Sequence, residues 1–170
     1  MKDDALSIAN YFIDKANSEG GEIKPLRLMK LVYIAHGFML ALVDRSVFNP
    51  RFDVVEAWKF GPVIPSVYHT FKRFKDHPIT EKAVVFMGKD GEITFEEPVL
   101  KDEEAKLICD FVWKRYRNFN DNELVSLTHE RNTPWAMVYQ EGKNNIIPDE
   151  FTRLYYKGLV SYMRKKANGG

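Results

Sequence analysis

Apolar residues recur at three- and four-residue spacing along most of this chain, a pattern typical of amphipathic helices. The first stripe covers residues 4–17, with Asp3 or Asp4 available as its N-cap, and Gly20 and Gly21 mark its end. Further stripes predict one helix that begins at Pro65 and ends before Pro78, and others that begin at about Asp102, Asn120, Thr133 and Pro148. The chain is therefore expected to be mainly helical.

The later predicted helices carry recognisable start and stop signals. Asn120 and Glu123 have capping-box spacing, and Thr133 precedes a proline that suits a first helical position, with Gly142 as the expected stop. The helix after Asp102 is expected to bury an apolar face made of Leu107, Ile108, Phe111, Val112 and Tyr116.

Residues 25–43 are apolar on almost every face of the predicted helix that begins at Pro25. Arg27, Lys30 and His36 interrupt the segment, and the apolar run after His36 is far shorter than the roughly 20 residues that a membrane span requires. A helix that is hydrophobic on most faces is typical of a domain centre. We therefore interpret this segment as a buried central helix.

Between residues 83 and 97 the spacing of apolar residues changes from that of a helix to that of a strand. Two short runs rich in β-branched and aromatic residues flank Asp90-Gly91 there. This segment predicts an antiparallel β hairpin, and residues 53–58 favour a strand or extended segment. The pattern indicates a mainly α, single globular domain of about six or seven helices around a buried central helix, with one small antiparallel β hairpin. We expect residues 1–166 to form this domain and residues 167–170 to be a disordered tail.

Composition limits the function classes. The 170 residues carry a net charge of +1, which produces no strong overall attraction to nucleic acid or anionic membranes. The N-terminus lacks the basic start and apolar run of a secretory signal, so a cytoplasmic protein without a membrane partner is expected. Cys109 is the single cysteine and lies in an apolar helical register, which predicts a buried residue rather than a reactive thiol.

The sequence contains few motifs that are typical of enzyme active sites. The chain has no glycine-rich phosphate loop, and its histidines do not have zinc-type spacing, so we predict no catalytic, metal-binding or cofactor-binding residues and no enzymatic activity. Two enzymatic alternatives remain open. Ser126, His129 and Asp121 lie within one helical neighbourhood, and a cleft near Glu56 and His129 could hold an acid or base.

Two stretches interleave basic and aromatic residues, residues 113–119 and 71–75, which is a composition found on nucleic-acid-binding surfaces. Helical spacing favours a different arrangement, in which Phe71 and Phe74 face the core while Lys72, Arg73 and Lys75 extend into water. Nucleic acid is therefore an alternative partner but not the expected one.

Three further segments carry a distinctive combination of motifs: PLRLMKLVYIAHGFMLAL, VEAWKFGPVIPSVYHTFKRF and LVSLTHERNTPWAMV. Taken together they resemble the Panacea domain family of SocA-like antitoxins, which includes phage-associated proteins. The resemblance covers about residues 5–139. The residues that carry it are Leu28, Lys30, Leu31, Tyr33, Ala35 and Gly37; Ala57, Trp58, Phe60, Gly61, Pro62 and Val63; and Thr128, His129, Pro134 and Trp135.

The resemblance implies an antitoxin of a toxin–antitoxin pair, with a cognate protein toxin as its partner. Members of the family bind and inhibit varied toxins. The type member instead acts as an adaptor that delivers its toxin to a cytoplasmic ATP-dependent protease, and the resemblance leaves both mechanisms open, including a ClpXP-like protease as a second partner.

Trp58 and Trp135 each stand beside a proline or Gly-Pro, where a stiff backbone fixes the direction of the indole ring. Such rings suit either the centre of an interface or a core in which two proline-containing turns pack together, with Thr128 and His129 satisfying buried backbone groups near the turns. We favour core packing for these motif residues. Lys59, His69 and Arg73 are predicted to be more exposed and are our candidates for a partner-binding surface.

Overall fold

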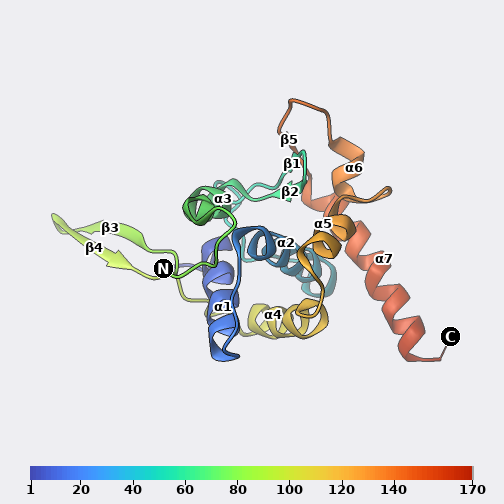
Figure 1. Cartoon of the computed structure of the whole chain (residues 1–170), viewed down its shortest axis with the longest axis horizontal. Helices are drawn as coiled ribbons and strands as arrows, with labels where there is room; N and C mark the ends of the chain where they lie inside the picture. Colours follow the sequence, from blue (N-terminus) through green and yellow to red (C-terminus); the bar gives the residue numbers. More distant parts are fainter. Residues whose placement is uncertain (170) are drawn as a thin grey trace.

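The computed structural model describes residues 1–169 and is mainly helical, as predicted (Figure 1). The helices in this part of the chain are α1 (Ala5–Ser18), α2 (Pro25–Val43), α3 (Pro65–Phe71), α4 (Glu103–Tyr116), α5 (Asp121–His129), α6 (Pro134–Val138) and α7 (Asp149–Ala167), with a 3₁₀ helix η1 (Lys72–Phe74). The strands are β1 (Glu56–Trp58), β2 (Gly61–Val63), β3 (Val85–Lys89), β4 (Glu92–Glu96) and β5 (Asn145–Ile146).

Helix α2 lies at the centre of the molecule, which confirms the prediction of a buried central helix. Helices α1, α4, α5 and α7 all contact it (Figure 1). Its length and composition alone would allow a membrane span, but 72% of its most apolar window is buried within the protein. Leu31, Ile34 and Phe38 have no exposed surface at all, so α2 supplies the core that the surrounding amphipathic helices cover.

The predicted caps explain where several helices begin. Asp4 and Ser7 form a reciprocal capping box at α1, and Asn120 and Glu123 do the same at α5. Thr133 accepts a hydrogen bond from the backbone of α6, which has proline at its first position. These side chains satisfy N–H groups that the first helical turn leaves without partners.

The sheet that contains β1 and β2 is larger than the sequence indicated. β1 and β2 pair antiparallel, with Glu56 opposite Val63 and Trp58 opposite Gly61, and β5 pairs with the other edge of β1. We refer to residues 56–65 as the elbow. Sequence reasoning recognised only one strand-like run there, because a proline in a three-residue strand and the distant β5 provide almost no local strand signal.

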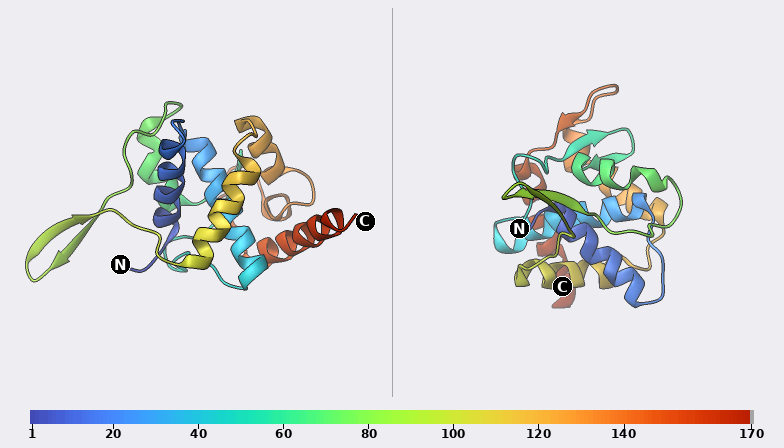
Figure 2. Two further views of the ribbon diagram at one scale, coloured as in Figure 1. Left: turned by 90° about the horizontal axis from the view of Figure 1, so that it is seen from below. Right: turned by 90° about the vertical axis from the view of Figure 1, so that its left-hand side faces the viewer.

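The β3–β4 hairpin is confirmed, with Phe86 opposite Phe95 and a turn at Asp90-Gly91. It projects away from the helical body as a two-stranded arm (Figures 1 and 2). Phe86 and Phe95, which share one face, are 73% and 74% exposed, and Met87 on the other face is 42% exposed, so neither face of the arm is covered by the rest of the described chain.

Two predicted details were wrong, and one was confirmed with an added 3₁₀ segment. Leu107 was expected on the apolar face of α4 but is 70% exposed; α4 contacts α1 and α2, and Ile108, Val112 and Tyr116 are the members of that face that are buried. The helix that begins at Pro134 ends at Val138, and Gly142, at φ +74°, lies in a later turn. The helix expected to begin at Pro65 and end before Pro78 is confirmed: its α-helical part ends at Phe71, and η1 continues it to Phe74.

Helix α7 continues to Ala167, and Asn168 and Gly169 close its last turn with backbone hydrogen bonds. The predicted tail therefore begins in helical structure, and Gly170 lies outside the described residues. The division into a domain of residues 1–166 and a disordered tail stays a prediction.

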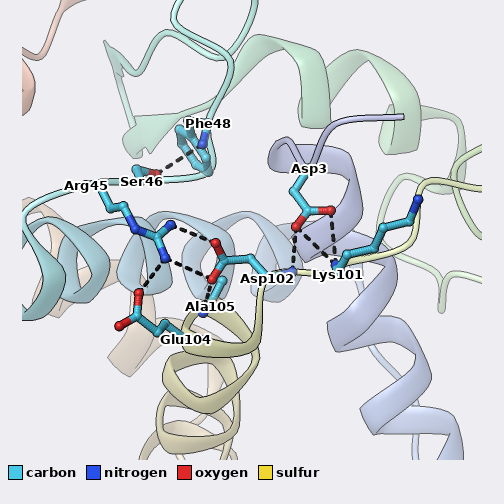
Figure 3. Close-up of polar contacts among 8 residues, drawn as sticks. All are labelled: Asp3, Arg45, Ser46, Phe48, Lys101, Asp102, Glu104 and Ala105. Atoms are coloured by element: carbon cyan, nitrogen blue, oxygen red, sulfur yellow. Dashed lines mark hydrogen bonds and ion pairs between the residues drawn. The ribbon is translucent and has the colours of Figure 1, made fainter.

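A polar cluster joins the N-terminal segment to the start of α4 and to the loop that follows α2 (Figure 3). The Asp3 carboxylate accepts hydrogen bonds from the backbone N–H groups of Lys101 and Asp102. Arg45 donates to Asp102 and Glu104, and its hydrogen bonds hold the pKa of Asp102 below the ordinary value. Because these side chains are largely exposed, the cluster positions α4 more than it stabilises the fold.

Candidate functional site

The three motif segments, which are far apart in the sequence, meet at one place. Lys30 from α2 approaches the Gly61-Pro62 pair of β2, and Thr128 from α5 lies on the other side of the same glycine. A Cβ atom added to Gly61 would lie 2.9 Å from the Lys30 Nζ and 3.4 Å from the Thr128 Oγ1. Gly61 also has φ +112°, which side-chain-bearing residues rarely adopt, so only glycine fits here without strain.

The third motif segment is joined to the elbow through its tryptophan. The Trp135 Nε1 donates a 2.6 Å hydrogen bond to the carbonyl oxygen of Trp58. Its indole ring stacks on the Tyr139 ring, with 4.4 Å between the ring centres. The His129 ring packs edge-on against the same indole, with 5.3 Å between the ring centres. The two tryptophans that flank prolines therefore belong to one packed unit. We call this unit the motif junction and define it by Lys30, Trp58, Gly61, Pro62, Thr128 and Trp135.

Lys30 is the most unusual residue of the motif junction, since it is only 1% exposed. Its Nζ donates a 3.1 Å hydrogen bond to the carbonyl oxygen of Pro62, and among residues 1–169 no carboxylate forms an ion pair with it. Burial disfavours the charged amine and lowers the pKa of Lys30 to about 7. The hydrogen bond joins α2 to the elbow, and burying the Lys30 amine costs free energy of desolvation.

The polar residues of α5 bond within their own helix. Thr128 Oγ1 donates to the carbonyl oxygens of Leu124 and Val125, and His129 Nδ1 is bonded to the Val125 oxygen. These side chains therefore satisfy backbone carbonyls of the last turns of α5 and not backbone groups of the elbow. Threonine and histidine near a helix C-terminus can reach the carbonyls of the preceding turn, which lie closer than the elbow backbone.

The enzymatic arrangements considered from the sequence are not assembled in residues 1–169. Asp121 accepts a 3.0 Å hydrogen bond from Arg27 rather than orienting His129, so the trio with Ser126 is not formed. Glu56 accepts a 2.7 Å hydrogen bond from the Trp58 Nε1. In the same described range, no group of three or more His, Cys, Asp or Glu residues is placed to hold a metal ion.

Cys109 is buried, as predicted, and burial raises the pKa of its thiol far above the ordinary value. The aromatic residues of the basic stretch at residues 113–119 are also largely inside. Trp113 stacks on Phe12, and Tyr116 is buried on the same face of α4. The Trp113 and Tyr116 rings therefore present no exposed face on which a base could stack, and the expectation that nucleic acid is not the partner stays a prediction.

Beside the motif junction lies an open apolar groove of about 590 Å³, bounded by the N-terminal end of α2, the elbow and α3. Met29, Val63, Val67 and Phe71 form its buried floor. Its more exposed walls and rim are formed by Leu26, Trp58, Lys59, Phe60, Tyr68, Lys72 and Lys75.

The predicted surface residues divide between two places. Lys59 lines the groove beside Phe60, and His69 contacts the Tyr68 ring next to it. Arg73 instead pairs with Glu81 at 2.6 Å and does not line the groove. Lys72 and Lys75, expected only to extend into water, do line the groove; the signal for them is their place directly after Phe71 and Phe74, the aromatic residues of α3 and η1.

The motif residues themselves serve different roles. Leu28, Leu31 and Tyr33 are buried in the core side of α2, and Pro134 is buried at the start of α6. Phe60 is 66% exposed at the tip of the elbow, although it belongs to the same motif as Trp58. A large aromatic ring held in water at the mouth of an apolar groove is a feature of binding surfaces.

This fold and motif arrangement define a family. Residues 28–136 match the family model described as "Antitoxin SocA-like, Panacea domain", and the chain belongs to that family. A curated relative is Antitoxin SocA of Caulobacter vibrioides (strain NA1000 / CB15N), which is 32% identical over 135 residues, covering 79% of this chain and 70% of the relative. No solved structure matches the chain.

Proposed function

We propose that this protein is the antitoxin of a toxin–antitoxin pair and neutralises a cognate protein toxin by binding it directly in the cytoplasm. The observation that carries the proposal is the relationship to Antitoxin SocA, together with the family match over residues 28–136, which includes residues of all three motif segments. The groove and the exposed Phe60 supply a surface with the features of a protein interface.

Binding, rather than catalysis, suits the chemistry of the site. The carboxylate of Glu56 and one ring nitrogen of His129 are engaged in internal hydrogen bonds, and the surroundings of the groove are mainly apolar. A rigid apolar surface with exposed aromatic and lysine side chains can exclude water from a partner surface. We therefore propose that the protein is not an enzyme.

The first test is co-expression of this chain with the product of the neighbouring open reading frame. We expect that product to arrest growth when expressed alone, and co-expression to restore growth and yield a complex that co-purifies. A product that is harmless, or a toxic product that is neither rescued nor bound, would contradict the proposal.

A second mode of neutralisation is delivery of the toxin to a cytoplasmic ATP-dependent protease, with this chain as the adaptor. The half-life of the toxin separates the two modes. If binding alone is sufficient, rescue persists in a host that lacks the protease and the toxin accumulates in the complex. If delivery is required, deletion of the protease abolishes rescue while the complex still forms.

A further inference from the structure

We propose that the groove is the toxin-binding surface and that its occupant is an apolar segment of the toxin flanked by acidic residues. This inference rests on the proposed function and adds to it the location and the chemistry of the interface. It derives from the shape, lining and charge of the groove.

The floor of the groove is apolar and preformed. Met29, Val67 and Phe71 are nearly buried, so their positions are set by the core of the domain before any partner arrives. The volume of about 590 Å³ is in the range that holds a few large side chains rather than a whole domain. A short amphipathic segment that inserts its apolar face would fill it.

The rim has one sign of charge. Lys59, Lys72 and Lys75 are exposed around the mouth, and among the described residues no aspartate or glutamate lines the groove. The protein as a whole carries a net charge of only +1, so this cluster is a local feature. Charge complementarity therefore assigns acidic residues to the flanks of the inserted segment.

The outer walls of the groove are largely exposed, which favours a polypeptide over a small amphiphile. Phe60 is 66% exposed at the elbow tip, and Leu26, another wall residue, is 43% exposed. A small ligand held on the floor would leave both side chains in water. A polypeptide segment that crosses the groove would cover them, in the way that rim residues exclude water around an interface centre.

The elbow is rigid enough to present this surface. Trp58 forms one wall of the groove, and its carbonyl oxygen accepts the hydrogen bond from Trp135 while its indole contacts Tyr68 at 4.9 Å. Because the motif junction holds the elbow against α2 and α5, a partner would meet side chains that are already in place. Little conformational entropy would be lost on binding.

The test uses the co-purified complex and two matched pairs of variants. The first pair compares the triple change Lys59→Glu, Lys72→Glu, Lys75→Glu with the triple change Lys89→Glu, Lys101→Glu, Lys165→Glu, which alters net charge equally at exposed lysines outside the groove. The second pair compares Phe60→Ser with Phe95→Ser, where both rings are highly exposed. Thermal unfolding establishes that each variant is folded.

We expect the groove variants to weaken toxin affinity by about tenfold or more and to lose rescue of growth, whereas the control variants keep both. Added salt should weaken the wild-type complex more than the complex of the groove lysine variant. Retained affinity in both groove variants, with the wild-type complex intact, would overturn the groove assignment and leave the proposed function standing. Absence of any wild-type complex would overturn both.

Photo-crosslinking locates the occupant directly. A benzoylphenylalanine at position 60 should crosslink to the toxin in the complex, and the same group at position 95 should not. Mass spectrometry of the crosslinked peptide should find apolar residues with aspartate or glutamate beside them. Crosslinking from position 95 alone, or to a basic segment, would contradict the proposed occupant.

Discussion

The elbow and the β3–β4 hairpin are both short antiparallel hairpins, but they have opposite relations to the rest of the protein. The elbow is enclosed by α2, α5 and β5, and its Gly61 has no room for a side chain. The arm stands in water, and Gly91 at its turn has no neighbouring atom within 4 Å of an added Cβ. Strong local strand signals therefore identified the arm, whereas tertiary contacts hold the elbow.

The two hairpins differ in how well they are suited to bind a partner. An isolated two-stranded hairpin is only marginally stable in water, because its side chains bury little surface. The elbow gains its stability from the body of the domain, so the surface that it presents beside the groove is rigid. Of the two hairpins, the elbow is the one suited to preorganised recognition.

The largest expected effect compares two glycines with positive φ. Gly61→Ala combines backbone strain at φ +112° with displacement of the buried Lys30 amine, and should lower the free energy of unfolding by about 3 kcal/mol. Gly91→Ala, at φ +80°, should cost less than about 1 kcal/mol, because the arm can open locally without global unfolding. Urea unfolding measures both, and equal losses would contradict the distinction.

The next effect depends on pH. In the folded protein the pKa of Lys30 is about 7, against an ordinary value of 10.5, so between these values the unfolded chain binds a proton that the folded protein has released. The contribution of Lys30 to the free energy of unfolding should therefore rise with pH, by about 1.5 kcal/mol from about pH 7 to about pH 8.5.

Lys30→Met should remove this part of the pH dependence, and unfolding of both proteins at the two pH values measures it. The range stops below 9.0, the ordinary pKa of the Cys109 thiol, because the raised pKa of that buried thiol produces the opposite slope at higher pH. The same slope in both proteins would show that the Lys30 amine is not desolvated.

A smaller effect concerns the link between the two tryptophans. Trp135→Phe removes the N–H that bonds to the Trp58 carbonyl oxygen, and we expect a loss of about 1 kcal/mol beyond the change in packing. Trp113→Phe is the matched control, because the buried Trp113 Nε1 has no hydrogen-bond partner in residues 1–169. A larger loss for Trp113→Phe would mean that packing, not the hydrogen bond, joins the elbow to α6.

The smallest effect is expected in the arm. Phe95→Ser should change the free energy of unfolding by less than about 0.5 kcal/mol, since the ring is 74% exposed and covers no part of the core. Denaturant unfolding of this variant beside Gly61→Ala completes the comparison. A loss above about 1 kcal/mol would show that the arm packs against the body in solution.

Local signals predicted much of the fold, and the reason lies in particular residues. Asp4, Asn120 and Thr133 act on N–H groups within their own helix turn, so their effect could be read from neighbouring residues. Leu107 shows where such reasoning stops, because its exposure depends on which elements cover α4. The candidate site was only partly predictable: Lys59 lines the groove, but Arg73 pairs with Glu81 instead.

The sequence by itself determined the helical class, the central position of α2, the β3–β4 hairpin and the family motifs. These depend on periodicity, caps and residue identity over short distances. Only the tertiary structure decided that Lys30, Gly61, Thr128 and Trp135 meet, that β5 extends the elbow sheet, and that a lysine-rimmed groove lies beside them. Contacts between residues 30 to 100 positions apart depend on how helices pack in space, and no local pattern encodes that distance.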